Sequence, residues 1–173
     1  RIWRLRYDGV PAVPATPAQP NSGATPGSPA IPGIEPRFTA PRMYQETPAQ
    51  LVAHLSHPNG WWRDTAQRLL ILKQDKSVVG ALQALARGAG APAGAPGQAP
   101  VVGRFHALWT LEGLGALDAG LVREFMRDAN PRVRIQGIRA AETLYKAGNR
   151  SFAADYKGLA KDADVDVAIQ ALL

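Results

Sequence analysis

The three histidines are the side chains of this sequence with the clearest capacity for metal or acid–base chemistry. His54 and His57 stand three residues apart, which would place them on one helical face, but Pro58 follows at once and ends such a helix. A metal ion would also need a third ligand, so we expect both to be capping or surface residues. His106 would ligate a haem only if another domain or chain supplied one.

No other pattern predicts catalysis or a bound cofactor. Gly88 and Gly90 lie in a run of Ala, Gly and Pro, without the strand–loop–helix context of a phosphate-binding loop. No nucleophile–base pair is visible, and Asp64 would act as a catalytic carboxylate only beside convergent polar groups that the sequence does not show. The chain has 0 Cys, which excludes thiolate metal sites and nucleophilic cysteines. We therefore expect no catalytic, cofactor-binding or metal-binding residue and no cofactor in this chain.

The composition describes a basic chain that can build a core. Of its 173 residues 46% are hydrophobic and 20% are charged, with a formal charge of +6 and an isoelectric point near 10.1. A positive charge permits contact with an acidic protein, a phosphate backbone or an anionic membrane surface, although a solvated basic surface is the better explanation. No run approaches the roughly 18 apolar residues of a transmembrane helix, which leaves only peripheral membrane association open.

Three segments differ in pattern. Residues 1–9 alternate apolar and polar side chains and end in Asp8-Gly9, which predicts the terminal strand of an upstream sheet domain. Residues 10–42 are rich in Pro, Ala and Gly, which predicts an extended linker. Residues 43–173 have a helical pattern that stops in mid-pattern, so we expect a truncated repeat domain within a longer polypeptide.

From residue 43 onward apolar residues recur with the 3.6-residue period of helices. Thr47 followed by Pro48 is typical of a helix start, and Pro-Asn-Gly at 58–60 separates this helix from a second one over 61–73. Further helices are predicted from Ser77, over 101–114, from Asp118, from Asn130-Pro131, from Ser151 and from Asp164, the last with Val167, Ile169 and Leu172 as its apolar stripe.

The second helix of each predicted hairpin carries a recurring four-residue pattern that ends in a small residue. The small residues are Ala66, Ala107, Gly137 and Ala171, and they fall 41, 30 and 34 residues apart. Such spacing is that of helical-hairpin repeats, and a small side chain lets paired helices approach closely. The sequence therefore predicts an all-α fold, a HEAT-like α-solenoid of about four helical hairpins, preceded by one β-strand and a Pro-rich linker.

Several residues of these second helices are candidates for packing or partner contacts. Of the adjacent Trp61 and Trp62, we expect one to enter the core and the other to lie at an interface. Asp64 is spaced to pair with Arg68; alternatively, Arg63 and Asp64 would bind turn carbonyls or amides of a neighbouring repeat. The candidate interaction residues are Trp61, Trp62, Arg63, Asp64, Arg104, His106, Trp109 and Arg134.

Three stretches add a family resemblance. HPNGWWRDTAQRLL at 57–70 resembles the first repeat of the HEAT segment in large bacterial "membrane-bound dehydrogenase" proteins. RFHALWTLEGL at 104–114 is similar to the second repeat. IWRLRYDG at 2–9 is similar to the closing strand of the β-propeller that precedes these repeats. That propeller is like those of sorbosone and soluble quinoprotein glucose dehydrogenases, and a cytochrome c domain often follows the repeats.

The resemblance implies a non-catalytic scaffold within a larger exported dehydrogenase-like redox protein. The residues that bind quinone and calcium belong to the propeller, and no Cys-x-x-Cys-His is present, so no catalytic residue carries over to this chain. It implies a periplasmic or cell-surface location and a protein partner, either the upstream propeller-like domain or other subunits of an assembly. Two alternatives stay open: a basic HEAT-like nucleic-acid-binding domain, and an enzyme acting within the repeats. We expect no nucleic-acid partner.

Overall fold

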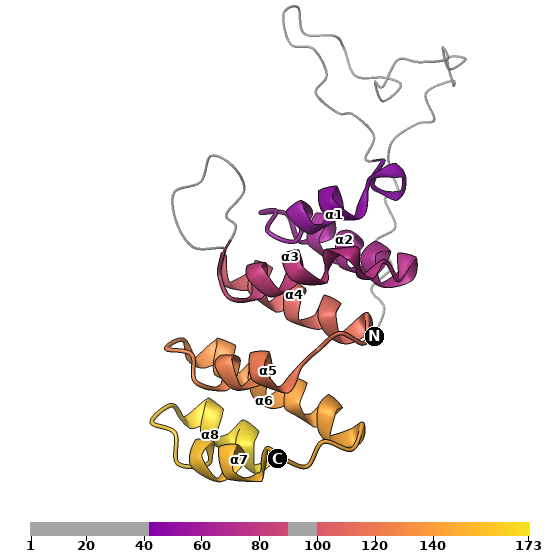
Figure 1. Ribbon diagram of the computed structural model, residues 1–173. Helices are drawn as coiled ribbons and strands as arrows, with labels where there is room; N and C mark the ends of the chain where they lie inside the picture. Colours follow the sequence, from indigo (N-terminus) through magenta and orange to yellow (C-terminus); the bar gives the residue numbers. More distant parts are fainter. Residues whose placement is uncertain (1–41, 90–99) are drawn as a thin grey trace, which may run out of the picture. The chain divides into compact units, whose positions relative to one another are not determined.

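The computed structural model describes residues 42–89 and 100–173 (Figure 1), within the compact unit Arg42–Leu173. The strand predicted over 1–9 and the linker up to residue 41 lie outside the described residues. Within those ranges the chain folds into helices and contains no strand. The predicted all-α class is confirmed for this part of the chain.

The described helices follow the predicted boundaries closely. They form four successive pairs, each made of a first helix and a second helix. The elements are η1 (Met43–Gln45), α1 (Pro48–His54), α2 (Gly60–Lys73), η2 (Lys76–Val78), α3 (Val79–Ala86), α4 (Val101–Gly113), α5 (Ala119–Met126), α6 (Pro131–Lys146), α7 (Ala153–Leu159) and α8 (Val165–Leu172).

Side-chain caps explain where most of these helices begin. Thr47 accepts a hydrogen bond from the amide of Gln50, whose side chain accepts one from the Thr47 amide, so α1 starts with a complete capping box. Asp118 and Asp164 cap α5 and α8 through their carboxylates. Asn130 caps α6, which has Pro131 at its first position. These predicted starts are confirmed.

Two predicted helix starts are wrong by a turn or less. Ser77 does not cap α3, because the carboxylate of Asp75 accepts the Ser77 amide and starts a 3-10 turn that runs into α3 at Val79. Ser151 does not cap α7, because the side chain of Asn149 accepts the Ser151 amide. In both cases an Asp or Asn two residues upstream takes the amide first, since its side chain readily closes such a turn.

Each helix packs against its partner in sequence, and the second helices also pack in a row. The pairs are α1 with α2, α3 with α4, α5 with α6 and α7 with α8, here called hairpins 1 to 4. In addition α2 contacts α4, α4 contacts α6, and α6 contacts α8. Figure 1 shows the helices succeeding one another in chain order, from indigo to yellow. Each hairpin therefore buries its apolar residues partly against the next one.

Small residues mark where helices come closest. Ala66 and Ala107 are fully buried, and Ala171 is partly buried. At Gly137 a Cβ atom would lie 2.7 Å from the backbone nitrogen of Met126 and 3.0 Å from the carbonyl carbon of Phe125. The predicted close approach is thus confirmed most sharply between α5 and α6, where only glycine fits.

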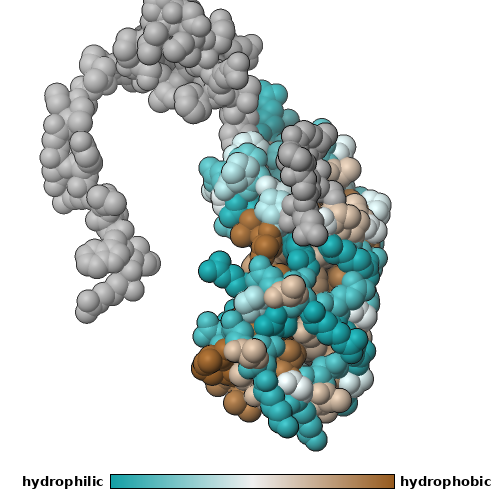
Figure 2. All heavy atoms as spheres, turned by 90° about the vertical axis from the view of Figure 1, so that its left-hand side faces the viewer, coloured by the Kyte–Doolittle hydropathy of each residue, from teal (hydrophilic) through white to brown (hydrophobic). Residues whose placement is uncertain are grey.

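The apolar stripe predicted for the last helix is only partly buried. Val167 is fully buried, but Ile169 and Leu172 are 50% and 73% exposed. These two residues are exposed because no described element covers the outer side of α8. Figure 2 shows apolar surface gathered at the end of the molecule that carries the C-terminal helices.

Candidate functional site

Three arginines occupy the same place, four residues after the N-cap of α2, α4 and α6. Arg63 Nη1 donates to the carbonyl oxygens of His57 and Pro58 at 2.6 and 2.8 Å. Arg134 Nη1 donates to the carbonyls of the two residues before its own N-cap at 2.9 and 3.1 Å. The predicted contact with turn carbonyls is therefore made within the same hairpin and not to a neighbouring repeat.

The other ends of two arginines reach the next hairpin. Arg104 Nη2 donates to Asp128 Oδ2 at 2.6 Å, and Arg134 Nη2 donates to Asp162 Oδ1 at 2.8 Å. All four side chains are less than 20% exposed. The bond from Arg134, together with the backbone amide of Asp164, holds the pKa of Asp162 below its ordinary value. These pairs fasten hairpin 2 to hairpin 3, and hairpin 3 to hairpin 4.

Two side chains join hairpin 1 to hairpin 2: Gln74 Nε2 donates to the carbonyl oxygen of Gly113 at 3.0 Å, and the arginine of α2 reaches an imidazole on α4. Arg63 Nε donates to His106 Nε2 at 3.3 Å, and His106 Nδ1 donates to Gln67 Oε1 at 2.7 Å. Asp64 Oδ1 lies 3.9 Å from His106 Nε2. Burial lowers the pKa of His106, and the charge of Arg63 lowers it further, while the charge of Asp64 opposes both. Both ring nitrogens of the neutral imidazole are thus engaged within the chain.

A second row of ion pairs joins the first helices and was not predicted. Arg87 Nε donates to Glu124 Oε2 at 2.8 Å, and Arg123 Nε donates to Asp155 Oδ2 at 3.1 Å. Arg123 also lies over the ring of Phe152 at 4.7 Å. The partners are 37 and 32 residues apart. Only the repeat length could have indicated them, because no short-range spacing links these residues.

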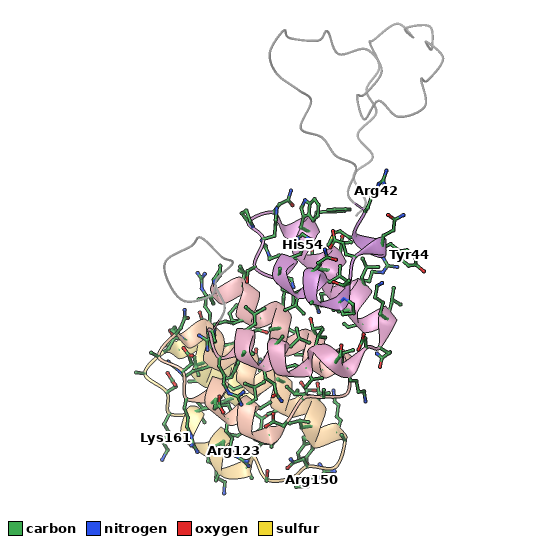
Figure 3. The ribbon with its side chains drawn as sticks, turned by 45° about the horizontal axis from the view of Figure 1, so that its top comes forward. Arg42, Tyr44, His54, Arg123, Arg150 and Lys161 are labelled. Carbon is green, nitrogen blue, oxygen red and sulfur yellow. The ribbon has the colours of Figure 1, made fainter. Side chains whose placement is uncertain are left out.

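The two tryptophans divide as expected between interior and surface. Trp61 is 53% exposed, whereas Trp62 is partly buried against the core, with the two rings nearly perpendicular at 5.7 Å. The rings of His54 and His57 lie 5.0 and 5.2 Å from Trp62. His54 Nε2 is also 2.9 Å from a carboxylate oxygen of Glu46. Figure 3 shows His54 at the end of the described region that is remote from Lys161.

The remaining candidates have structural partners. Trp109 Nε1 donates to Gln136 Oε1 at 2.9 Å, which joins α4 to α6. The predicted Asp64–Arg68 pair is not formed among the described residues, and the Asp64 carboxylate lies near His106 instead. Asp64 on α2 lies near His106 on α4 because these two helices are in direct contact.

One groove, with a volume of about 460 Å³, lies beside α6 and α8. Its polar groups bond to one another: Lys146 with Glu142 at 2.6 Å, and Arg139 with Gln170 at 3.1 Å. The hydroxyl of Tyr156 donates to a backbone carbonyl, and burial raises its pKa. The groove therefore contains no paired nucleophile and base. Its lining residues are Ile138, Arg139, Glu142, Tyr145, Lys146, Tyr156, Gln170 and Leu173.

Broader searches of the chain add no site. Among residues 42–89 and 100–173, no three His, Asp or Glu side chains lie together as metal ligands. No helix in the described part of the chain is long and apolar enough to cross a membrane. Comparisons of this chain with models of protein families, with curated proteins and with solved structures found no match.

Proposed function

We propose that residues 43–173 form a HEAT-like α-solenoid of four hairpins that serves as a non-catalytic, protein-binding scaffold. The observation that carries this proposal is the recurrence of one contact. An arginine four residues after the N-cap of a second helix bridges to the next hairpin from α2, α4 and α6 in turn. A contact that repeats with the hairpin is what a stack of nearest-neighbour units requires.

The surface proposed for the partner is the side of the second helices that faces away from the first helices. Residues with equal spacing from the N-cap fall in line across a row of packed helices. Trp61 and Val102 both stand two residues after an N-cap and are 53% and 41% exposed. Ile169, which is 50% exposed, stands five residues after the N-cap of α8, about one helical turn further along. Exposed aromatic and apolar side chains are typical of protein interfaces.

The setting of this scaffold is a further part of the proposal. We infer from the family resemblance that it belongs to an exported dehydrogenase-like redox protein in the periplasm or at the cell surface. Its partner would then be a propeller-like domain or another subunit of the same assembly, and any redox cofactor would be bound there. The chemistry of such a protein would lie outside residues 43–173.

The nucleic-acid alternative receives less support from the side chains. Binding a phosphate backbone needs Lys and Arg that are free to replace counterions. Arg63, Arg104 and Arg134 instead bond to protein groups, and Arg87 and Arg123 are paired with carboxylates. A titration with duplex DNA at low salt provides the direct check, and salt-dependent binding at micromolar concentration would favour this alternative.

Site-specific photo-crosslinking in the full-length protein tests the scaffold proposal. A photo-reactive residue is placed at Trp61, Val102 or Ile169, and at the exposed positions Ala81 and Ala154 of the first helices as matched controls. We expect discrete crosslinks to one protein or domain, identified by mass spectrometry, from the first three positions only. Equal yields from both sets, or none from either, would contradict the proposed surface.

A further inference from the structure

In the turn of hairpin 1 a histidine ring nitrogen accepts a backbone hydrogen bond. In the turns of hairpins 3 and 4 an aspartate carboxylate accepts the corresponding bond. In the turn before α6, Asp128 Oδ1 accepts the backbone amide two residues later at 2.8 Å. Asp162 Oδ1 does the same before α8 at 2.9 Å. In the turn before α2 the acceptor is His57 Nδ1, which takes the amide of Asn59 at 3.0 Å. The three turns are built alike, apart from the chemical nature of the acceptor.

The contacts between hairpins show the same replacement of a carboxylate acceptor by an imidazole acceptor. The arginine of α4 reaches the carboxylate of Asp128, and that of α6 reaches the carboxylate of Asp162. The arginine of α2 reaches His106 Nε2. Hairpin 1 therefore depends on two unprotonated imidazole nitrogens, one in its turn and one at its contact with α4.

An imidazole acceptor is lost when it takes up a proton, and a carboxylate acceptor keeps its charge through the same pH range. Imidazole titrates near neutral pH, whereas aspartate does so about two to three pH units lower. A proton on His106 Nε2 would direct an N–H toward the N–H of Arg63 and place a second positive charge beside that guanidinium. A proton on His57 Nδ1 would face the donor amide of Asn59. Both events turn an acceptor into a donor that faces another donor.

The charged groups around His106 determine how strongly a proton on its ring is disfavoured. The charged groups that act on His106 are Arg63 and Asp64, both from α2, and α3 has no titratable side chain. Asp64 would attract a protonated His106, but its carboxylate is 3.9 Å away and 77% exposed, so solvent weakens that attraction. The His106 side chain is only 18% exposed, and its burial disfavours the charged form.

Beside His57, the other histidine acts in the opposite direction. His54 Nε2 lies 2.9 Å from Glu46 Oε2, so a proton on His54 completes an ion pair and fastens η1 to α1. That contact lies inside hairpin 1 and its leading turn, and it does not reach α4. It therefore does not replace the contact between Arg63 and His106.

We propose that the contact between hairpin 1, formed by α1 and α2, and hairpin 2 is acid-sensitive: it opens when His106 is protonated, a proton on His57 disrupts the turn inside hairpin 1, and hairpins 3 and 4 stay docked. Detachment uncovers the face of α4 that α2 covers, and it moves Trp61 and Trp62 relative to the other second helices. This inference does not depend on the identity of any partner. It adds a conformational response to pH to the scaffold proposed above.

Hydrogen exchange of the full chain, followed by mass spectrometry, measures the two parts separately. Protection factors, corrected for intrinsic exchange, are compared at about pH 7.5 and about pH 5.5. These values lie on either side of the ordinary imidazole pKa of about 6.5, which applies to His106 once opening exposes it, so stability is lost as the pH falls below that value. We expect the protection of α1 and α2 to fall about tenfold or more at the lower pH, the equivalent of losing one hydrogen bond that involves a charged donor. The protection of α5 and α6 should stay unchanged. An equal loss in both regions, or none in α1 and α2, would overturn the proposal.

Histidine variants assign the response. His57→Asp supplies the carboxylate that the later turns use, and His106→Gln keeps an acceptor for Arg63 without a titratable ring. The double variant should retain the protection of α1 and α2 at the lower pH. His54→Gln is the matched control from the same helix pair and should show the wild-type loss. Persistence of the loss in the double variant, or its disappearance in His54→Gln, would assign the response elsewhere and refute the proposal. If the double variant does not fold, the comparison of α1 and α2 with α5 and α6 in the wild-type protein at the two pH values still tests the proposal.

Discussion

Replacing Gly137 by alanine tests whether α5 and α6 meet as closely as their packing requires. The added Cβ would lie 2.7 Å from the backbone nitrogen of Met126, and 3.0 Å from both the carbonyl carbon and the Cβ of Phe125. Two of these atoms are backbone and all three are buried in the contact of the two helices. No side-chain rotation relieves the clash, so the helices themselves must separate.

The expected cost follows from two opposing effects. Alanine favours the helical state over glycine by about 1 kcal/mol at an interior position. Overpacking of a well-filled interior costs about 1–3 kcal/mol, and contact with backbone atoms places Gly137→Ala near the upper end. We therefore expect a net loss of about 2 kcal/mol in the free energy of unfolding. Gly80 in α3 has no heavy atom within 4 Å of its missing Cβ, so Gly80→Ala should instead gain about 0.5–1 kcal/mol.

Urea denaturation followed by circular dichroism measures both variants against the wild type. The opposite signs of the two substitutions are the decisive feature, because the chemical change is identical and only the surroundings differ. A Gly137→Ala variant as stable as the wild type, beside a stabilised Gly80→Ala variant, would refute the reasoning on close approach.

Three further predictions test other contacts, two of them with a matched control substitution. Arg134→Ala should lower the free energy of unfolding by about 3 kcal/mol, because the carboxylate of Asp162, which is largely shielded from water, loses its guanidinium partner. The exposed Arg132 on the same helix is the control, and Arg132→Ala should change the free energy of unfolding by less than about 0.5 kcal/mol. Because the pKa of Asp162 is lowered from 3.8 by Arg134, its contribution is present above that pH and is lost as the pH falls through the lowered pKa; the deficit of Asp162→Asn in urea denaturation should therefore shrink in acid. Leu108→Ala at a fully buried site should cost about 3 kcal/mol, and Leu172→Ala, 73% exposed, should cost much less when thermal unfolding is compared.

The sequence was sufficient to locate the helices because their ends depend on local chemistry. Thr47, Asp118, Asn130 and Asp164 each cap a helix within three residues, and such signals can be read from a single chain. The misplaced starts near Ser77 also had a local cause, since two candidate caps stood within two residues. Which of two neighbouring cap residues accepts the backbone amide depends on the backbone conformation of the turn, and the amino-acid composition does not specify that conformation.

The contacts between hairpins could be predicted only in part. The arginine before each small residue was visible as a repeated letter, but its destination was not, because the partner depends on the register between two hairpins. Arg104 reaches Asp128 across 24 residues, and Arg87 reaches Glu124 across 37. The exposure of Ile169 could not be predicted for a related reason: an apolar stripe shows which face can be covered and does not show what covers it.

The arginines of α2, α4 and α6 join successive hairpins through different acceptors, an imidazole in the first contact and a carboxylate in the other two. The contacts of Arg104 and Arg134 pair a guanidinium with a carboxylate that is largely shielded from water, so both salt and mild acid affect them little. The contact of Arg63 is made to a neutral ring, and α8 has Ala168 at the corresponding place. Resistance to mild acid should therefore be greatest across hairpins 2 to 4 and least at hairpin 1, even though all four are built from the same helical pattern. In a stack whose units contact only their neighbours, a first contact weakened by acid lets that hairpin open alone, because no long-range interaction obliges the others to follow.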